Sequence, residues 1–221
     1  ANGAQVHLHS GVAAMERNEN GFAVTAGDGR VFNTRFIVNA GGLDAGRIAA
    51  MAGDESFSIY PRSGEYIVMA KGTGALVHSV LFQMPTKMGK GILVTPTVYG
   101  NLIIGPDAIN ETVNDCDTHP ERLRHIYAQA LETTRALDMR KFLRSFAGVR
   151  PVSSTDDFII GASRVKGLIN AAGIQSPGLT SSPAIAEMVR DALADEGLDL
   201  REKETFASER RAYIRPEHDL T

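Results

Sequence analysis

Short hydrophobic runs separated by glycine and polar turns fill the first part of the chain. Residues 4–8 fit a strand, and the runs 21–25 and 31–32 flank an Asp-Gly pair within residues 27–29, which favours a hairpin. The β-branched run 35–40 is typical of a strand that is buried on both faces of a sheet. The pattern therefore predicts mostly β structure at the start of the chain.

The run 35–40 leads directly into a glycine pair and then into a helical pattern. Gly41 and Gly42 follow the strand, residues 43–51 fit a helix, and Gly53 ends it. A strand, a glycine turn and a helix in this order bring backbone amides close to a ligand, because no side chain blocks the approach.

Residues 57–105 return to a β pattern, and a long amphipathic helix follows. Four apolar runs separated by glycine and proline predict an antiparallel sheet: residues 66–69, 77–82, 91–94 and 101–104. Thr118 and Glu121 have the spacing of a capping box at the start of the helix. The apolar stripe of this helix indicates packing and consists of Leu123, Ile126, Tyr127, Ala130, Leu131 and Leu137.

The last third of the chain returns to the pattern of the first part. Residues 158–161 and 168–172 fit buried strands, and the second of them leads into the glycine-rich loop Gly173–Thr180. The helix that follows has Ser182 and Pro183 placed for its first turn.

This order predicts an α+β protein in which a sheet-rich insert, residues 57–149, separates two parts of another domain. Those parts are residues 1–56 and 150–197, and the charged residues 198–221 form a tail or linker. Both flanking parts contain a strand, a glycine turn and a helix, whereas the insert does not.

Composition narrows the class of protein. The 221 residues are 43% hydrophobic, which is enough for a packed core, and the formal net charge of −3 argues against a nucleic-acid partner. A single cysteine, Cys116, excludes an intrachain disulfide and an all-cysteine metal cage and fits a reducing compartment. No apolar run approaches the roughly 20 residues that a membrane-spanning helix needs. We expect a cytoplasmic protein, with peripheral attachment to the inner face of the membrane as an alternative.

Two glycine turns are candidate ligand sites. Amides at the start of a helix suit phosphate or another electron-rich group. The Gly41–Gly42 pair fits tight packing of a helix on a sheet equally well, whereas the longer Gly173–Thr180 loop favours a functional role. Neither turn has the G-x-G-x-x-G fingerprint of a dinucleotide site, which the chain lacks.

The two glycine segments also carry a family resemblance. Val38–Gly42 and Gly173–Ala186 resemble two flavin-contacting segments of the D-amino-acid-oxidase-like flavoenzyme superfamily. Four further segments, in consistent order along the chain, resemble its branch of glycerol-3-phosphate dehydrogenases and L-2-hydroxyglutarate oxidases: Pro61–Tyr66, Lys90–Thr97, Asn101–Pro106 and Gly148–Pro151.

The resemblance implies an FAD-dependent oxidoreductase with an antiparallel substrate domain inserted in a partial FAD-binding domain, which is Rossmann-like and of the GR2 type. The family's G-x-G-x-x-G turn would lie before Ala1. The chain is then expected to be a fragment that is inactive alone and binds FAD poorly or not at all. The tail around Phe206, Arg210 and Ile214 resembles a stretch that leads to a small iron–sulfur domain in some relatives.

The resemblance also assigns contacts with the cofactor. It implies that Val12 lies by the adenine, and that Ala40 and Gly41 lie near the adenosine and the pyrophosphate. The loop after residues 168–172 would lie along the isoalloxazine, where amides at the helix start stabilise negative charge on reduced flavin. The loop residues assigned to the flavin are Gly173, Ile174, Pro177, Gly178, Leu179 and Thr180.

Three residues are candidates for contact with substrate. Arg150 presents a fixed fork to carboxylate or phosphate, and its alternative role is an ion pair with Asp156 or Asp157. Gln175 could hydrogen-bond substrate or flavin, or stabilise its own loop. Tyr66 closes the pocket in one interpretation and is ordinary strand packing in the other.

The histidines and the cysteine offer one further candidate. His78, on an expected strand, fits a catalytic base that removes an alcohol proton, although a lone strand histidine is more often an ordinary residue. His7 and His9 share a strand face but lack a third ligand, so no metal site is expected. Cys116 has no neighbouring base or cation to activate it as a nucleophile.

The expected parent enzyme oxidises a small anionic alcohol by hydride transfer to flavin and passes the electrons to a quinone or another carrier. The residues do not decide between glycerol 3-phosphate and a 2-hydroxy acid. Two alternatives stay open: an amine or amino-acid oxidase of the same superfamily, and a non-catalytic binding or interaction module.

Overall fold

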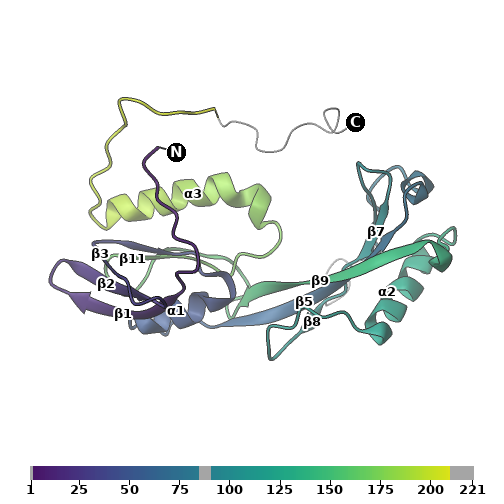
Figure 1. Cartoon of the computed structure of the whole chain (residues 1–221), viewed down its shortest axis with the longest axis horizontal. Coiled ribbons are helices and arrows are strands. Elements are labelled where there is room, and N and C mark those ends of the chain that lie inside the picture. Colours follow the sequence, from purple (N-terminus) through teal and green to yellow (C-terminus); the bar gives the residue numbers. More distant parts are fainter. Residues whose placement is uncertain (1, 85–90, 210–221) are drawn as a thin grey trace.

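A computed structural model describes residues 2–84 and 91–209, and its strands form three sheets. Figure 1 shows two lobes joined by the long strands β5 and β9. Lys90, Arg210 and Ile214, which carry part of the family resemblance, lie outside the described residues.

The first sheet is an antiparallel meander at the start of the chain. It confirms the hairpin, because the amide of Gly29 donates to the carbonyl of Ala26 across the turn. The strand expected over residues 4–8 is wrong, since that segment has no regular structure and the first strand begins at Val12. The strands are β1 (Val12–Asn18), β2 (Gly21–Ala26) and β3 (Val31–Thr34).

The second sheet joins segments from both ends of the chain. Its order is β10–β11–β4, with β11 parallel to β4 and antiparallel to β10. Every residue of β11 is buried, as expected. β4 does not have both faces buried, because it is the edge strand of this sheet in the described chain and Val38 is 41% exposed. The strands are β4 (Ile37–Asn39), β10 (Ile159–Ala162) and β11 (Leu168–Ala172).

Two helices pack against this second sheet. α1 contacts β4 and β11, and α3 contacts β10 and β11. α3 begins at Gly178, a full turn before the expected start, so Ser182 and Pro183 lie inside the helix and not in its first turn. The bounds are α1 (Ala45–Met51), preceded by the short 3-10 helix η1 (Gly42–Asp44), and α3 (Gly178–Asp195).

The third sheet is antiparallel throughout, as the sequence pattern predicts. β5 is its central strand and pairs with β7 and β8, while β9 runs along β5 from Ile59↔Ser153 to Met69↔Phe142. The strands are β5 (Ile59–Met69), β6 (Leu93–Pro96), β7 (Leu102–Gly105), β8 (Ile109–Asn110) and β9 (Phe142–Ser153). The 3-10 helices η2 (Thr73–Leu76) and η3 (Met139–Lys141) lie in its connections.

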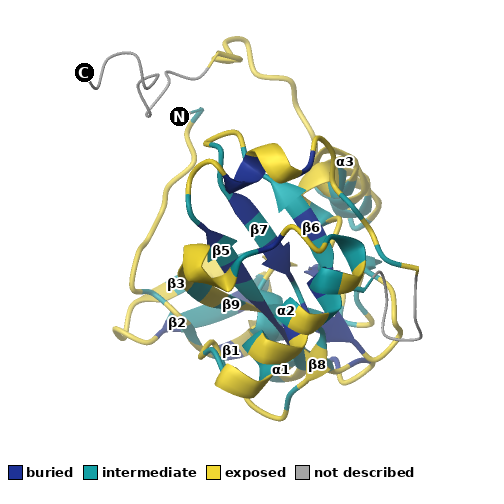
Figure 2. Ribbon diagram, turned by 90° about the vertical axis from the view of Figure 1, so that its right-hand side faces the viewer, coloured by how far each residue is buried: buried dark blue, intermediate teal, exposed yellow. Residues whose placement is uncertain are grey.

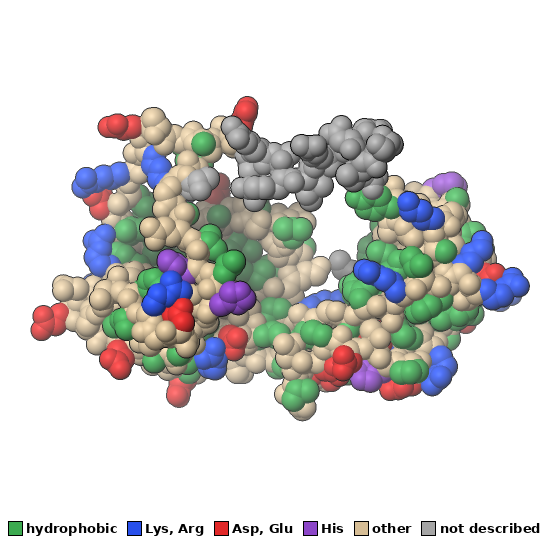
Figure 3. All heavy atoms as spheres, viewed as in Figure 1, with side chains coloured by type: hydrophobic (Ala, Val, Ile, Leu, Met, Phe, Trp, Pro, Cys, Tyr) green, Lys and Arg blue, Asp and Glu red, His purple; other side chains and the backbone are tan. Residues whose placement is uncertain are grey.

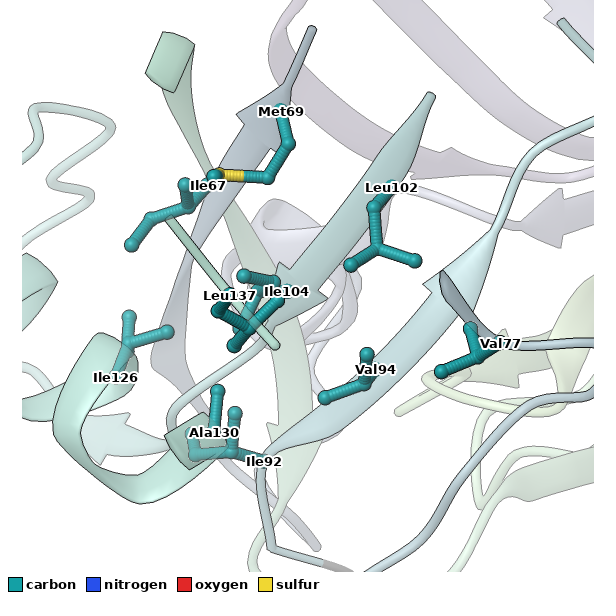
Figure 4. Close-up of a cluster of buried hydrophobic side chains, with 10 residues drawn as sticks. All are labelled: Ile67, Met69, Val77, Ile92, Val94, Leu102, Ile104, Ile126, Ala130 and Leu137. Atoms are coloured by element: carbon teal, nitrogen blue, oxygen red, sulfur yellow. The ribbon is translucent and has the colours of Figure 1, made fainter. Parts of the chain in front are cut away.

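The main hydrophobic core lies between the third sheet and α2 (Pro120–Thr133). Ile67 of β5, Ile104 of β7 and Ile126 of α2 are fully buried (Figure 4). Figure 2 shows this core from outside: the buried strands lie behind α2, and the exposed side of α2 is turned toward solvent. Each such large side chain contributes about 1.5–3 kcal/mol through burial, which fixes the face of β5 that meets α2.

Three further expectations about the insert need correction. Residues 77–82 are not a strand, since only Leu81 forms an isolated bridge, with Val94. α2 ends at Thr133, and Leu137 reaches the core from the loop beyond it. Thr118 does not cap α2, because its hydroxyl bonds Ser145 Oγ at 3.0 Å.

Candidate functional site

A pair of glycines forms the floor of a site on β5 and β9 that is open over only one of them. Gly64 and Gly148 are directly opposite each other in the strand pairing. A Cβ placed on Gly148 would meet nothing within 4 Å, whereas one on Gly64 would lie 2.9 Å from the carbonyl of Asp107 and from Cβ of Pro106, and 3.1 Å from Nη2 of Arg150. The guanidinium of Arg150 therefore lies over Gly64, next to open space above Gly148.

Arg150 has no acidic partner in the described part of the chain. It makes no hydrogen bond or ion pair there, and both alternative partners are engaged elsewhere. Asp156 Oδ1 accepts from the hydroxyl of Tyr60 at 3.5 Å, and Asp157 Oδ1 accepts from the amide of Phe158 at 2.7 Å. The structure thus contains neither of the two ion pairs that were the alternative role for Arg150.

A second arginine, which the sequence did not single out, lies directly across from Arg150. Arg62 pairs with Arg150 in the β5–β9 register, so both side chains are on the same face of the sheet. Arg62 Nε donates to Asn110 Oδ1 at 2.7 Å, and its guanidinium lies 6.0 Å from the ring centre of Tyr60. Figure 3 shows basic side-chain atoms at the floor of the hollow between the two lobes.

An aromatic pair adjoins the glycine floor on the other side. Tyr66 is opposite Phe146, and their rings stack with centres 4.7 Å apart and an interplanar angle of 7°. Tyr66 is therefore packed against Phe146 and also borders the glycine pair. Both interpretations of this residue fit that position.

The opposite face of β5 holds a buried charged network. Arg122 donates from Nε and Nη2 to Asp107 at 2.7 Å each, and its guanidinium lies 3.1 Å from Glu65 and 3.2 Å from Glu111. His119 Nδ1 lies 2.8 Å from Glu65 Oε1, and this hydrogen bond raises the pKa of the imidazole. The bond with Asp107 likewise raises the pKa of Arg122. The nearby carboxylates are therefore neutralised away from the Arg62–Arg150 face.

The Gly173–Thr180 loop begins beside the end of β9. Gly173 has a φ of +65°, and a Cβ there would lie 2.8 Å from Cβ of Ser153. Ser153 Oγ in turn donates to the carbonyl of Asp157 at 2.6 Å. Only glycine fits this close contact, which holds the loop next to the strand that carries Arg150.

The start of α3 presents unpaired backbone donors. The amide of Gly178 donates to the carbonyl of Gln175 at 2.6 Å, and no side chain caps the helix. The amides of Leu179 and Thr180 have no acceptor among the described residues, and Leu179 is 91% exposed. The side-chain amide of Gln175 makes no bond to a described residue. This end of an 18-residue helix is suited to an electron-rich group.

Both glycine turns leave the second sheet at the same edge. β4 and β11 are parallel, and Asn39 pairs with Asn170 just before the turns, with Nδ2 of Asn39 3.0 Å from Oδ1 of Asn170. A Cβ on Gly41 would lie 2.5 Å from Cδ1 of Ile48, so the Ile48 side chain would have to shift to admit any larger residue there. The exposed Ala40 precedes that turn.

The remaining candidates lie in different surroundings. The carbonyl of Val12 accepts from Arg47 of α1 at 3.3 Å, which places the start of β1 beside that helix. His78 is exposed, lies outside any strand and makes no polar contact with a described residue. It follows η2, in the lobe of the third sheet that contains β7 (Figure 1).

Two features are absent from the described residues. No helix there is long and apolar enough to cross a membrane. No group of three or more His, Cys, Asp and Glu side chains in residues 2–84 and 91–209 could hold a metal ion.

Comparison with known proteins places these features in a family. The chain is 40% identical over 215 residues, or 96% of its length, to a glycerol 3-phosphate dehydrogenase of Caloramator mitchellensis, of which it covers 44%. A more distant relative is the L-2-hydroxyglutarate dehydrogenase of Salmonella houtenae, 26% identical over 66% of this chain and 34% of that protein. The chain thus spans less than half the length of these curated relatives.

A solved structure with a similar fold comes from the same group of enzymes as the sequence relatives. The fold matches the dithionite-reduced L-α-glycerophosphate oxidase of Mycoplasma pneumoniae with FAD bound, with a TM-score of 0.80 and 27% identity over 89% of this chain and 52% of that one. A sequence model of the DAO family, described as FAD dependent oxidoreductase, matches residues 1–192. The chain therefore belongs to the DAO family of FAD-dependent oxidoreductases.

Proposed function

We propose that this chain is part of a flavoenzyme that oxidises a small anionic alcohol, of the glycerol 3-phosphate type, with FAD as hydride acceptor. The observation that carries the proposal is the position of Arg150. Its guanidinium has no counter-ion among residues 2–84 and 91–209 and lies beside the open space above Gly148, on the strand whose end contacts the Gly173–Thr180 loop. The family membership and the glycerol 3-phosphate relatives support the same substrate class.

The residues present fit FAD in part. The unpaired amides of Leu179 and Thr180 at the start of α3 suit the negative charge of a reduced flavin. A Cβ on Gly42 would meet nothing within 4 Å, so backbone is accessible at the neighbouring turn. The G-x-G-x-x-G segment is not part of this sequence, so the remaining contacts would come from elsewhere in the whole protein.

Each part of the chain then has a defined task. Bound flavin supplies the hydride acceptor. Arg150 binds the anionic group of the substrate, and Gly148 lets the substrate approach the backbone of β9. In this arrangement residues 57–149 are the substrate domain, between FAD-domain parts 1–56 and 150–197. Tyr66 and Gln175 border the pocket, and Val12 and Ala40 lie toward the adenosine. His78 makes no polar contact with a described residue, so no contact supports its role as the base.

The proposal extends to the partners of the whole protein. A quinone or another carrier would take the electrons, an iron–sulfur domain would follow residue 221, and the enzyme would be cytoplasmic. L-2-hydroxyglutarate is the second candidate substrate, favoured by the more distant relative.

The test is an anaerobic absorption spectrum of the whole protein with its upstream segment present. We expect flavin absorbance that bleaches on addition of glycerol 3-phosphate and does not bleach with L-2-hydroxyglutarate. Arg150→Gln should keep the flavin content and lose bleaching at low substrate concentration. A colourless protein would refute the flavoenzyme, and bleaching by L-2-hydroxyglutarate alone would replace the substrate.

A further inference from the structure

The pairing of Arg62 with Arg150 is electrostatically unfavourable as it stands. Like charges directly opposite each other in a strand pair destabilise it, and neither guanidinium has an ion-pair partner in the described chain. The carboxylates of Glu65, Asp107 and Glu111 bond Arg122 or His119 on the other face. On one face of β5 the carboxylates are paired with cations, whereas on the other face two arginines lie together. The charge of these two arginines suits an anionic ligand.

Arg62 is also held in one orientation. Its Nε donates to Asn110 Oδ1 at 2.7 Å, and the guanidinium lies over the ring of Tyr60. Asn110 belongs to β8, on the side of β5 away from β9, and pairs with Arg62 in register. The terminal nitrogens of Arg62 have no acceptor among the described residues, so they are available to a ligand.

We propose that Arg62 is a second anion-binding residue of the substrate site, positioned by Asn110, and that Arg62 and Arg150 together select a phosphate dianion. This inference rests on the proposed function. A phosphate monoester carries about −1.5 to −2 charges at pH 7 and three acceptor oxygens, so it can accept from two guanidinium groups at once. A single carboxylate is satisfied by one bidentate arginine, and it leaves the second guanidinium of the pair uncompensated.

The experiment measures steady-state kinetics of the whole holoenzyme with glycerol 3-phosphate, and inhibition by inorganic phosphate. Hydrogen bonds between charged groups contribute about 1.5–3 kcal/mol, so Arg62→Gln should raise KM roughly 10- to 100-fold and weaken phosphate inhibition to a similar extent. Flavin content and kcat should change little. Arg144→Gln is the matched control, since Arg144 is on the same strand as Arg150 but lies opposite Val68, beyond the Tyr66–Phe146 stack.

Asn110→Ala tests the positioning role. It should raise KM by a smaller factor in the parent enzyme and have no further effect in the Arg62→Gln background, because the two residues act through one group. An additive effect would refute the role of Asn110.

The outcomes separate the two proposals. If the parent enzyme is not reduced by glycerol 3-phosphate, the proposed function fails and this inference with it. If the parent enzyme turns over but Arg62→Gln leaves KM and phosphate inhibition unchanged, only the inference fails. An equal rise in KM for Arg144→Gln would also overturn it, because the effect would then be general electrostatic attraction.

Discussion

Replacing Arg122 with methionine should destabilise the protein far more than removing a surface ion pair. The side chain of Arg122 is 11% exposed, and it contacts Asp107 and Glu65, whose side chains are 9% and 0% exposed. Removing one partner of a buried pair costs about 3–5 kcal/mol, because the remaining charge stays buried without compensation. Methionine keeps most of the apolar stem, so lost packing adds little to this figure.

Equilibrium urea unfolding at neutral pH, followed by far-UV circular dichroism, measures the loss. The control is Arg140→Met, since Arg140 bonds Asp138 but its side chain is 90% exposed. Exposed pairs contribute about 0–1 kcal/mol, so the two variants should differ by at least about 2 kcal/mol. Equal losses of unfolding free energy in the two variants, with an unchanged slope of that free energy against urea concentration, would show that the buried network contributes no more than a surface pair.

Three further changes test other parts of the structure. Gly148→Ala should raise KM for glycerol 3-phosphate without loss of stability, because the added methyl enters open space at the substrate floor; an unchanged KM would contradict this. The hydrogen bond that His119 donates to Glu65 raises the pKa of the imidazole above 6.5, so its stabilising effect is complete below pH 6.5 and is lost as pH rises through the folded value. A His119→Gln variant should lack this loss in urea unfolding between pH 6 and 9. Burial opposes ionisation of Asp54, but hydrogen bonds, the strongest from Ser163, outweigh it and lower its pKa below 3.8. The stabilisation by Asp54 is therefore present above pH 3.8 and lost as pH falls through the folded pKa, so Asp54→Asn should flatten acid unfolding.

The elements that the sequence predicted are those whose side-chain pattern reports burial directly. β11 is apolar throughout and buried throughout, and the apolar stripe of α2 meets the sheet. β9 was missed because its open face carries Arg144, Gly148 and Arg150, so no apolar alternation marks it. That strand is specified by its pairing with β5, which is distant in sequence. Residues 77–82 have a strand-like composition but only one bridge, which shows that composition without a neighbouring strand is insufficient.

The candidate site was predictable where a local feature carried the chemistry. The Gly173 loop could be found because a glycine-rich turn follows a buried strand, and Arg150 because its residue type suits an anion. Arg62 could not be found in this way, since its candidacy as an anion-binding residue depends on the strand register that sets it opposite Arg150. The role of His78 was attached to a strand that the structure does not contain.

The buried network and the open site depend on each other through the alternation of β5. Glu65 faces α2, where His119 and Arg122 neutralise it, whereas Gly64 and Tyr66 on either side of it belong to the face of the arginines. A slip of one residue in the β5–β9 pairing would move the β9 side chains to the other face. It would bring Arg150 toward the Arg122 network and remove the guanidinium from the floor. Contacts that fix Glu65 thus also fix the face of β5 on which Arg62 lies. A variant such as Arg122→Met should therefore impair anion binding in proportion to its loss of stability, although Arg122 itself faces away from the site.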